Sequence, residues 1–286
     1  MKNITLSAIL SAGIALAGSA AFAEGQPPAE IKPFVIDGIE MVAEAQAPDF
    51  IDIPEIFSGW EFRSSETQEL QLDDFDNPGM LEVDNALDNW NTVEGTAGKS
   101  CASCHADGPE EFAGLATVMP RWNADKGQLE TMEDVINRMR VENMGAEPWK
   151  WGKTDLNGMV ALINLQSRGQ VRNVAIDGPV ADLWAQGEEI YYRKQGQLGM
   201  SCSSCHEENY GVRIRAEILS QGQTNGFPVY RLKNAHLNSV ENRFKGCMKN
   251  MRAEPYTPGG PEFHALELYV ASRGNGLSIE GPGVRN

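Results

Sequence analysis

Two five-residue motifs constrain this chain more than any other feature. Cys-Ala-Ser-Cys-His spans residues 101–105, and Cys-Ser-Ser-Cys-His spans 202–206, 101 positions later. In the c-type haem signature Cys-x-x-Cys-His, both thiols form thioethers to the porphyrin and the His binds iron. A thioredoxin-like pair would not need the His, and a zinc site would need further nearby ligands. The motifs predict two covalently bound c-type haems. The predicted haem-binding residues are Cys101, Cys104, Cys202 and Cys205 for the thioethers, with His105 and His206 as iron ligands.

Further landmarks recur in the same order after each motif. Met-Gly-Ala-Glu-Pro-Trp at 144–149 corresponds to Met-Arg-Ala-Glu-Pro-Tyr at 251–256, and Ser-Arg-Gly at 167–169 recurs at 272–274. Such self-similarity indicates an internal duplication. We therefore predict a mainly α fold of two tandem cytochrome c-like haem domains, at 84–175 and 176–286, joined near Gly178-Pro179. Apolar spacing predicts helices at 84–92, 154–168, 180–192 and 261–273. In the last of these, Phe263, Leu266, Tyr269 and Val270 form one buried stripe.

The N-terminal region has two parts. Residues 1–23 have a basic start, an apolar stretch and an Ala-Phe-Ala ending, which together predict a cleaved signal peptide and export to the periplasm. Residues 24–83 are rich in acids and prolines, and predict an extended segment that wraps the first domain. No later stretch is long and apolar enough to predict a membrane span.

The charge balance limits the partners. The chain carries 24 basic and 40 acidic residues, a formal charge of −16. Removal of residues 1–23 takes away only Lys2, leaving 23 basic against 40 acidic residues and a charge of −17. This balance argues against nucleic acid or an anionic membrane as partner.

Cys247 is the one cysteine of five that the motifs do not use. An unpaired thiol in an exported protein is buried and inert, bridged to another chain, or used chemically. Residues 242–253 hold four cations and no acid, and this run is either a solvated basic face or a site. Around a thiol, cations lower the pKa and attract a small dianion. The four cations are Arg243, Lys245, Lys249 and Arg252.

Few residues remain as second iron ligands. Apart from the two motif histidines, the chain has only His236 and His264, both in the second copy, and we interpret both as packed or surface residues. Cys247 precedes the Met-Arg-Ala-Glu-Pro-Tyr segment, at the place where a distal ligand is expected. A soft thiolate there would lower the reduction potential of the second haem.

The sequence around Cys247 resembles the SoxA family, dihaem subunits of the SoxAX cytochromes of bacterial thiosulfate oxidation. The resemblance is carried by residues 243–256, Arg-Phe-Lys-Gly-Cys-Met-Lys-Asn-Met-Arg-Ala-Glu-Pro-Tyr, with the two haem motifs and the signal peptide. It implies a heterodimer with the monohaem cytochrome SoxX. It also implies oxidative joining of thiosulfate to a cysteine of the carrier SoxY, with two electrons passing through SoxX to a c-type cytochrome.

The resemblance implies roles for individual residues. Cys247 corresponds to the active-site cysteine, which ligates iron and can be found as a persulfide, and Arg243 corresponds to the substrate-binding arginine. Our own hypothesis is that Lys245 or Arg252 assists Arg243 in binding thiosulfate. The chain departs from the family at the first haem, because Ile-Asn-Arg at 136–138 is followed by Met139 where a cysteine is expected. Met139, or alternatively Met144, is then the predicted second ligand there. Two rival functions stay open: a dihaem electron carrier, and another dihaem oxidoreductase such as a tetrathionate-forming thiosulfate dehydrogenase or a peroxidase.

Overall fold

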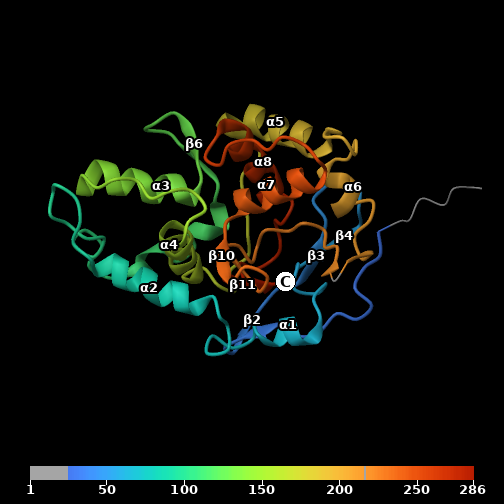
Figure 1. Ribbon diagram of the computed structural model, residues 1–286, viewed down its shortest axis with the longest axis horizontal. Coiled ribbons are helices and arrows are strands. Elements are labelled where there is room, and N and C mark those ends of the chain that lie inside the picture. The colour runs from blue at the N-terminus through green and yellow to red at the C-terminus, as the bar shows by residue number, and fades with distance from the viewer. Residues whose placement is uncertain (1–24, 216) are drawn as a thin grey trace, which may run out of the picture.

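The computed structural model describes residues 25–286 apart from Ala216, so the predicted signal peptide lies outside the described residues. Helices α2, α3 and α4 form one side of the molecule in Figure 1, and α5 to α8 form the other, with short strands between and below them. The α-helices are α1 (Ser65–Glu69), α2 (Met80–Asn91), α3 (Met132–Met139), α4 (Thr154–Leu165), α5 (Ala181–Tyr192), α6 (Cys202–His206), α7 (Val240–Asn250) and α8 (Pro261–Ser272).

Short strands make up the rest of the regular structure. The strands are β1 (Val35–Ile36), β2 (Ile39–Glu40), β3 (Glu44–Gln46), β4 (Glu55–Phe57), β5 (Arg121–Asn123), β6 (Gln128–Glu130), β7 (Arg213–Ile214), β8 (Glu217–Ile218), β9 (Val229–Arg231), β10 (His236–Asn238) and β11 (Gly283–Arg285). In the part of the chain that the structure describes they form four two-stranded sheets and one three-stranded sheet of order β10-β9-β11. The prediction of a mainly α fold is therefore met only in part, because hairpins replace helix in the loops around the motifs.

Each copy is built on one packed helix pair. In the first copy α2 packs against α4, and in the second α5 packs against α8. These four helices confirm the predicted ones, with ends that differ by a few residues. The predicted stripe on α8 is buried, since Phe263, Leu266, Tyr269 and Val270 all belong to one hydrophobic cluster. Burial of this apolar stripe stabilises the second core.

The duplication extends to the turn before each motif. An isolated bridge joins Glu94 to Lys99 in the first copy and Gln195 to Met200 in the second. Within the second of these turns, Gly196 has φ of +70°, and a Cβ there would lie 2.3 Å from the carbonyl oxygen of Met251. The matching glycine of the first copy meets the carbonyl of Met144 at 2.2 Å. Both copies thus dock the haem-motif turn on the same downstream segment.

The two copies are not separate in space. The cluster of buried residues around α2 and α4 also contains Leu237 of β10 and Ile279. Asn157 of α4 donates a side-chain hydrogen bond to the carbonyl of Leu237 at 2.8 Å. Segments of the predicted second domain therefore complete the core of the first.

The segment 25–83 is more than an extended wrap around the first domain. It has its own small core, in which Phe34 stacks on Trp60 with ring centroids 4.2 Å apart. It reaches the first copy through Arg168, whose guanidinium binds Asp74 at 2.8 and 2.9 Å. Other contacts go to the second copy, where Phe57 and Phe62 pack with Tyr210. The segment thus contacts both copies. No helix in the described part of the chain is long and apolar enough to cross a membrane.

Candidate functional site

The second haem motif forms the short helix α6, and its geometry prepares His206 to bind a metal. Ser201 caps α6 with a reciprocal hydrogen bond to Ser204. The Nδ1 of His206 lies 2.7 Å from the carbonyl oxygen of Ser220. A carbonyl can only accept, so Nδ1 carries the proton and Nε2 is left for a ligand bond. Metal-binding histidines show the same pattern, in which the ring nitrogen that does not bind the metal donates to a carbonyl or carboxylate.

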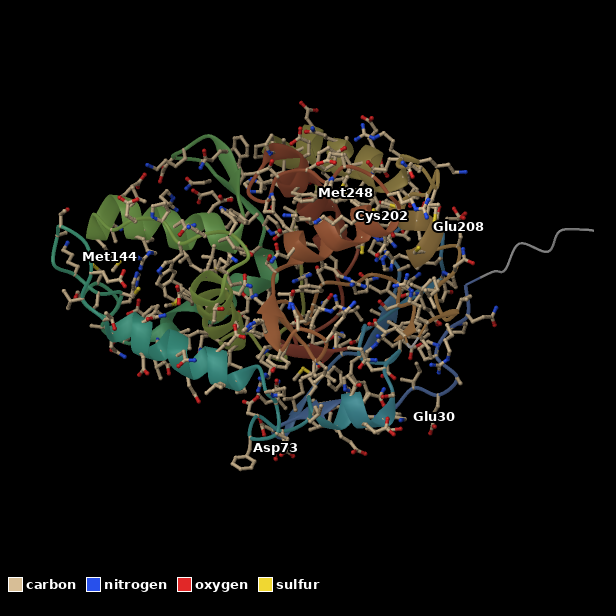
Figure 2. All side chains as sticks on the ribbon, in the orientation of Figure 1. Glu30, Asp73, Met144, Cys202, Glu208 and Met248 are labelled. Carbon is tan, nitrogen blue, oxygen red and sulfur yellow. The ribbon has the colours of Figure 1, made fainter. Side chains whose placement is uncertain are left out.

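Cys247 lies on α7 opposite this histidine. Its side chain is within hydrogen-bonding reach of His206. Cys247 and Arg243 stand four residues apart on α7, which places both on one helix face. Cys202 belongs to the same hydrophobic cluster as Met248 of α7, and Figure 2 shows these two residues close together where α6 meets α7. The structure therefore brings the thiols and His of the second motif, Cys247 and Arg243 into one site.

The electrostatic environment makes Cys247 an acidic thiol. Burial by itself raises the pKa of its thiol, but the charge of Arg243, the hydrogen bond and charge of His206, and the charge of Arg231 outweigh it. The result is a pKa lowered from 9.0 to about 7. Close to half of such a thiol is thiolate at neutral pH, the form that binds iron and reacts with sulfur.

The neighbouring motif thiol is perturbed in the opposite direction. Burial and the nearby Cys247 raise the pKa of Cys202 to about 12. Cys202 therefore differs chemically from Cys247, although both lie in one site.

The basic run of the sequence contributes less than its composition suggests. Arg243 is the only member of that run among the principal charges that act on Cys247. Lys245 and Lys249 are two residues from Arg243 and Cys247 respectively, so they project from other faces of the helix. Arg252 follows α7 and is exposed, with a left-handed φ of +57°. Lys245 and Arg252 have no contact in the structure that supports a role at Cys247.

Arg231 is the site residue that the sequence did not reveal. It comes from β9, sixteen positions before Cys247, and is isolated from the basic run. Its Nε and Nη2 donate to the main-chain oxygen of Asn286 at 2.9 and 2.6 Å, which fixes the guanidinium. Only the pairing of β9 with β11 brings these distant segments together, so no local sequence signal could have found it.

The first haem motif borders a cavity of about 680 Å³, which includes the part open to solvent. Its lining is mostly apolar, as a porphyrin requires. His105 places Nδ1 3.0 Å from a carboxylate oxygen of Glu111, so its Nε2 is also left for a ligand bond. The cavity lining includes Trp90, Cys101, Cys104, His105, Phe112, Ile136, Met139, Met144 and Met159.

Both methionines that we considered as ligands line this cavity. Met139 is the last residue of α3, and its Sδ accepts a hydrogen bond from Asn143 at 3.0 Å. Met144 is buried at the end of a single π-helical turn, Arg140–Met144. The segments from Thr131 to Met144 and from Ser239 to Met251 differ by one residue, and the π turn accommodates the extra one.

The donor sets of both motifs fit a c-type haem. Each motif offers two thiols and a histidine whose Nδ1 already has a hydrogen-bond partner. A further sulfur is available at each site: Cys247 lies within reach of His206, and Met139 and Met144 line the cavity beside His105. The other two histidines lie elsewhere. His236 is exposed, 3.6 Å from Glu82, and His264 lies against Trp151 and near Asp134. His236 is thus a surface residue and His264 a packed one, which agrees with our interpretation of the sequence.

Comparisons with known proteins agree with this arrangement. The SoxA/TsdA cytochrome c domain family matches residues 85–171 and 186–279, one stretch in each copy. The "L-cysteine S-thiosulfotransferase subunit SoxA" of Paracoccus pantotrophus is 50% identical over 96% of this chain and 94% of its own length. The protein of the same name from Rhodovulum sulfidophilum is 49% identical over the full length of both chains.

A solved structure gives the same result for the fold. A chain in the crystal structure of SoxXA from P. pantotrophus superposes with a TM-score of 0.88, covering 91% of this chain and all of that one, at 50% identity. Near-complete coverage at this identity, together with a family match in both copies, places the chain within the SoxA family of cytochrome c-domain proteins.

Proposed function

We propose that this chain is the haem-binding catalytic subunit of an L-cysteine S-thiosulfotransferase, which joins thiosulfate oxidatively to a cysteine of a SoxY carrier. The observation that supports this most is the acidic, unpaired thiol of Cys247 facing His206, one helical turn from Arg243. A protein that only relays electrons needs no reactive thiol. The names of the close relatives favour the same activity.

The residues of the site support a two-stage reaction. Arg243 forms no ion pair with another described residue, so its guanidinium is available to hold the sulfonate oxygens of thiosulfate. The Cys247 thiolate forms a bond to the sulfane sulfur, and two electrons leave. The carrier cysteine then attacks that sulfur, and the bond to Cys247 breaks with Cys247 thiolate as the leaving group. A lowered thiol pKa favours departure.

We propose two covalent c-type haems, which when bound accept the electrons released in the coupling. Cys101 and Cys104 would hold the first and Cys202 and Cys205 the second, with His105 and His206 as iron ligands. Cys247 would be the second ligand of haem two. Met139 is the preferred second ligand of haem one, because it takes the helical position that Cys247 takes in the other copy.

The relatives support a partner, and the sequence supports a location. The similar solved structure is of SoxXA, which supports a heterodimer of this chain with a SoxX cytochrome. The predicted signal peptide at 1–23 supports a location in the periplasm. A c-type cytochrome would accept electrons from the heterodimer.

Replacing Cys247 by Ser tests the activity directly. In the purified, haem-loaded heterodimer we expect loss of thiosulfate conjugation to SoxY, measured as the mass increase of the carrier. We also expect loss of one thiolate-ligated low-spin haem signal by electron paramagnetic resonance, with the other haem unchanged. Conjugation at the wild-type rate would refute the catalytic role of Cys247.

Product analysis separates this function from its rivals. Free tetrathionate formed without a carrier would instead indicate a thiosulfate dehydrogenase. Peroxide turnover would indicate a peroxidase. Electron exchange with a cytochrome but no sulfur product would indicate a simple carrier.

A further inference from the structure

We propose that Arg231 is a second anion-binding residue beside Cys247, and that the carboxylate of Glu217 occupies it until thiosulfate displaces that carboxylate. The inference deepens the proposed function and rests on it, because thiosulfate is taken as the anion. Arg231 would then be a second arginine, beside Arg243, that determines the affinity for thiosulfate. It belongs to β9 and is positioned by β11, which lies far from α7 in the sequence.

The position of Arg231 is fixed from two sides. The side-chain Nε and Nη2 of Arg231 both donate to the main-chain oxygen of Asn286. The backbone of Arg231 lies opposite Arg285 where β9 pairs with β11. Nη2 also lies 3.4 Å from a carboxylate oxygen of Glu217. The Nη1 group takes part in none of these bonds. A guanidinium held at one edge can offer its other edge to an oxyanion.

Residues 217–220 bind both Arg231 and His206, the proposed iron ligand. Glu217 begins β8, and Ser220, three residues later, accepts the hydrogen bond from Nδ1 of His206. Arg231 and His206 are therefore both bonded to residues 217–220. This short link ties the Arg231 guanidinium to the segment that orients His206, and the charge of Arg231 acts on Cys247.

Glu217 is the internal anion at this place. One of its oxygens lies near Arg231, and the other lies 3.2 Å from Nη1 of Arg63. The Glu217 side chain is 30% exposed, against 5% for Arg63 and 21% for Arg231. The ion pair of Glu217 with Arg231 is partly exposed, and such pairs contribute little to stability. A dianion that carries two charges and several acceptor oxygens can therefore compete with this carboxylate.

Arg231, and not Arg63, is the arginine open to the substrate. Arg63 is nearly buried and its Nη2 also donates to the carbonyl of Ile218. Arg63 is thus a support for β8. The charged groups that face Arg231 are Glu217 and, through their fields, Arg243 and Cys247. Two arginines and one displaceable carboxylate around a thiol form a site selective for a small dianion.

The test uses the haem-loaded heterodimer with four variants at constant ionic strength. We expect Arg231→Gln to raise KM for thiosulfate about tenfold, because one charge-assisted hydrogen bond is lost. The fall in kcat should be smaller than the rise in KM, because Arg243 and His206 still favour the Cys247 thiolate. Arg231→Lys keeps the charge without the planar fork, so its KM should be intermediate. Glu217→Gln should lower KM, because the competing carboxylate is gone. The double variant should match Arg231→Gln if Glu217 acts through Arg231.

Two controls separate this effect from general charge. Lys233→Gln removes an exposed cation two residues along the same hairpin, and Glu30→Gln removes an exposed acid at the outside of the molecule (Figure 2). Neither should change KM. Calorimetric titration with thiosulfate alone gives the same comparison without turnover, and the haem absorption spectrum verifies that each variant is folded.

The outcomes distinguish the inference from the function on which it rests. Unchanged thiosulfate affinity in Arg231→Gln, or weaker binding in Glu217→Gln, would overturn the inference while conjugation by the wild type continued. A wild-type heterodimer that conjugated nothing would instead refute the proposed function, and the titrations would still test the anion site.

Discussion

Met139 holds, in the first copy, the helical position that Cys247 holds in the second. Met139 lies eight residues after Thr131, the N-cap of α3, and Cys247 lies eight residues after Ser239, the N-cap of α7. Equal distance from equivalent caps puts the two sulfur atoms on equivalent helix faces. After this point the first copy carries one extra residue in its π turn.

This equivalence predicts the second iron ligand of the proposed first haem. Met139→Leu should remove the absorption band of methionine-ligated ferric haem and leave the thiolate signal of the second haem unchanged. Met139→Cys should lower the potential of the first haem, because a thiolate stabilises ferric iron more than a thioether does. Met144→Leu is the matched control, since Met144 lines the same cavity. Loss of the band in Met144→Leu alone would assign the ligand to Met144.

The turn before the second motif predicts a stability effect. Gly196 combines φ of +70° with a Cβ position 2.3 Å from the Met251 carbonyl, so Gly196→Ala adds both backbone strain and a clash. We expect a loss of roughly 2–4 kcal/mol in the free energy of unfolding, measured by urea denaturation. Gly199→Ala is the control, because φ is +57° but nothing lies within 4 Å. It should cost only about 1–2 kcal/mol. Equal losses would show that the Met251 contact has no effect.

Much of the scaffold follows from local sequence. Helical periodicity identified α4, α5 and α8, because each buries a continuous apolar face and needs no distant partner to reveal it. The repeated landmarks identified the duplication, since equivalent segments fold alike. Cys247 and Arg243 were recognisable because the haem motifs leave Cys247 unused, and because the run of cations around it, with Arg243, resembles the SoxA segment.

Other features depend on contacts that no local pattern encodes. Arg231 reaches the site through the pairing of β9 with β11, which joins residues more than fifty positions apart. The four cations near Cys247 looked alike in sequence, yet helix geometry directs only Arg243 to the thiol. For segment 25–83 we predicted only an extended conformation. Its strands are two or three residues long, which is too short to produce a recognisable alternation of apolar and polar residues.

We predict that replacing Arg252 by glycine increases the stability of the fold. Its φ of +57° is the left-handed conformation that Gly145 has at the matching turn of the first copy. Arg252→Gly should therefore stabilise the chain by about 1 kcal/mol in urea unfolding, with KM for thiosulfate unchanged. Lys249→Gly, at an exposed position inside α7, is the control and should destabilise. A raised KM in Arg252→Gly would restore Arg252 as a substrate-binding residue.

A buried acid cluster between the copies predicts how stability depends on pH. Glu241 of α7 faces Glu133 and Asp134 of α3 and His264 and Glu267 of α8. Burial, with the charges of Glu133 and Asp134, raises the pKa of Glu241 to about 9, although the amide of Gly259 donates a hydrogen bond to it. A carboxyl whose folded pKa exceeds its unfolded value of 4.5 stabilises the fold fully below pH 4.5. That contribution is lost as pH rises through 9.

Glu241→Gln should remove this pH dependence, because the amide never ionises. The free energy of unfolding of the variant, relative to wild type, should therefore increase from pH 5 to pH 9 by about 1 kcal/mol or more. Urea unfolding at several pH values measures it. Glu254→Gln alters an exposed acid and should leave the difference constant. A relative stability of Glu241→Gln that fell with rising pH would mean that Glu241 is ionised in the fold, and that the cluster attracts a positive charge instead of holding protons.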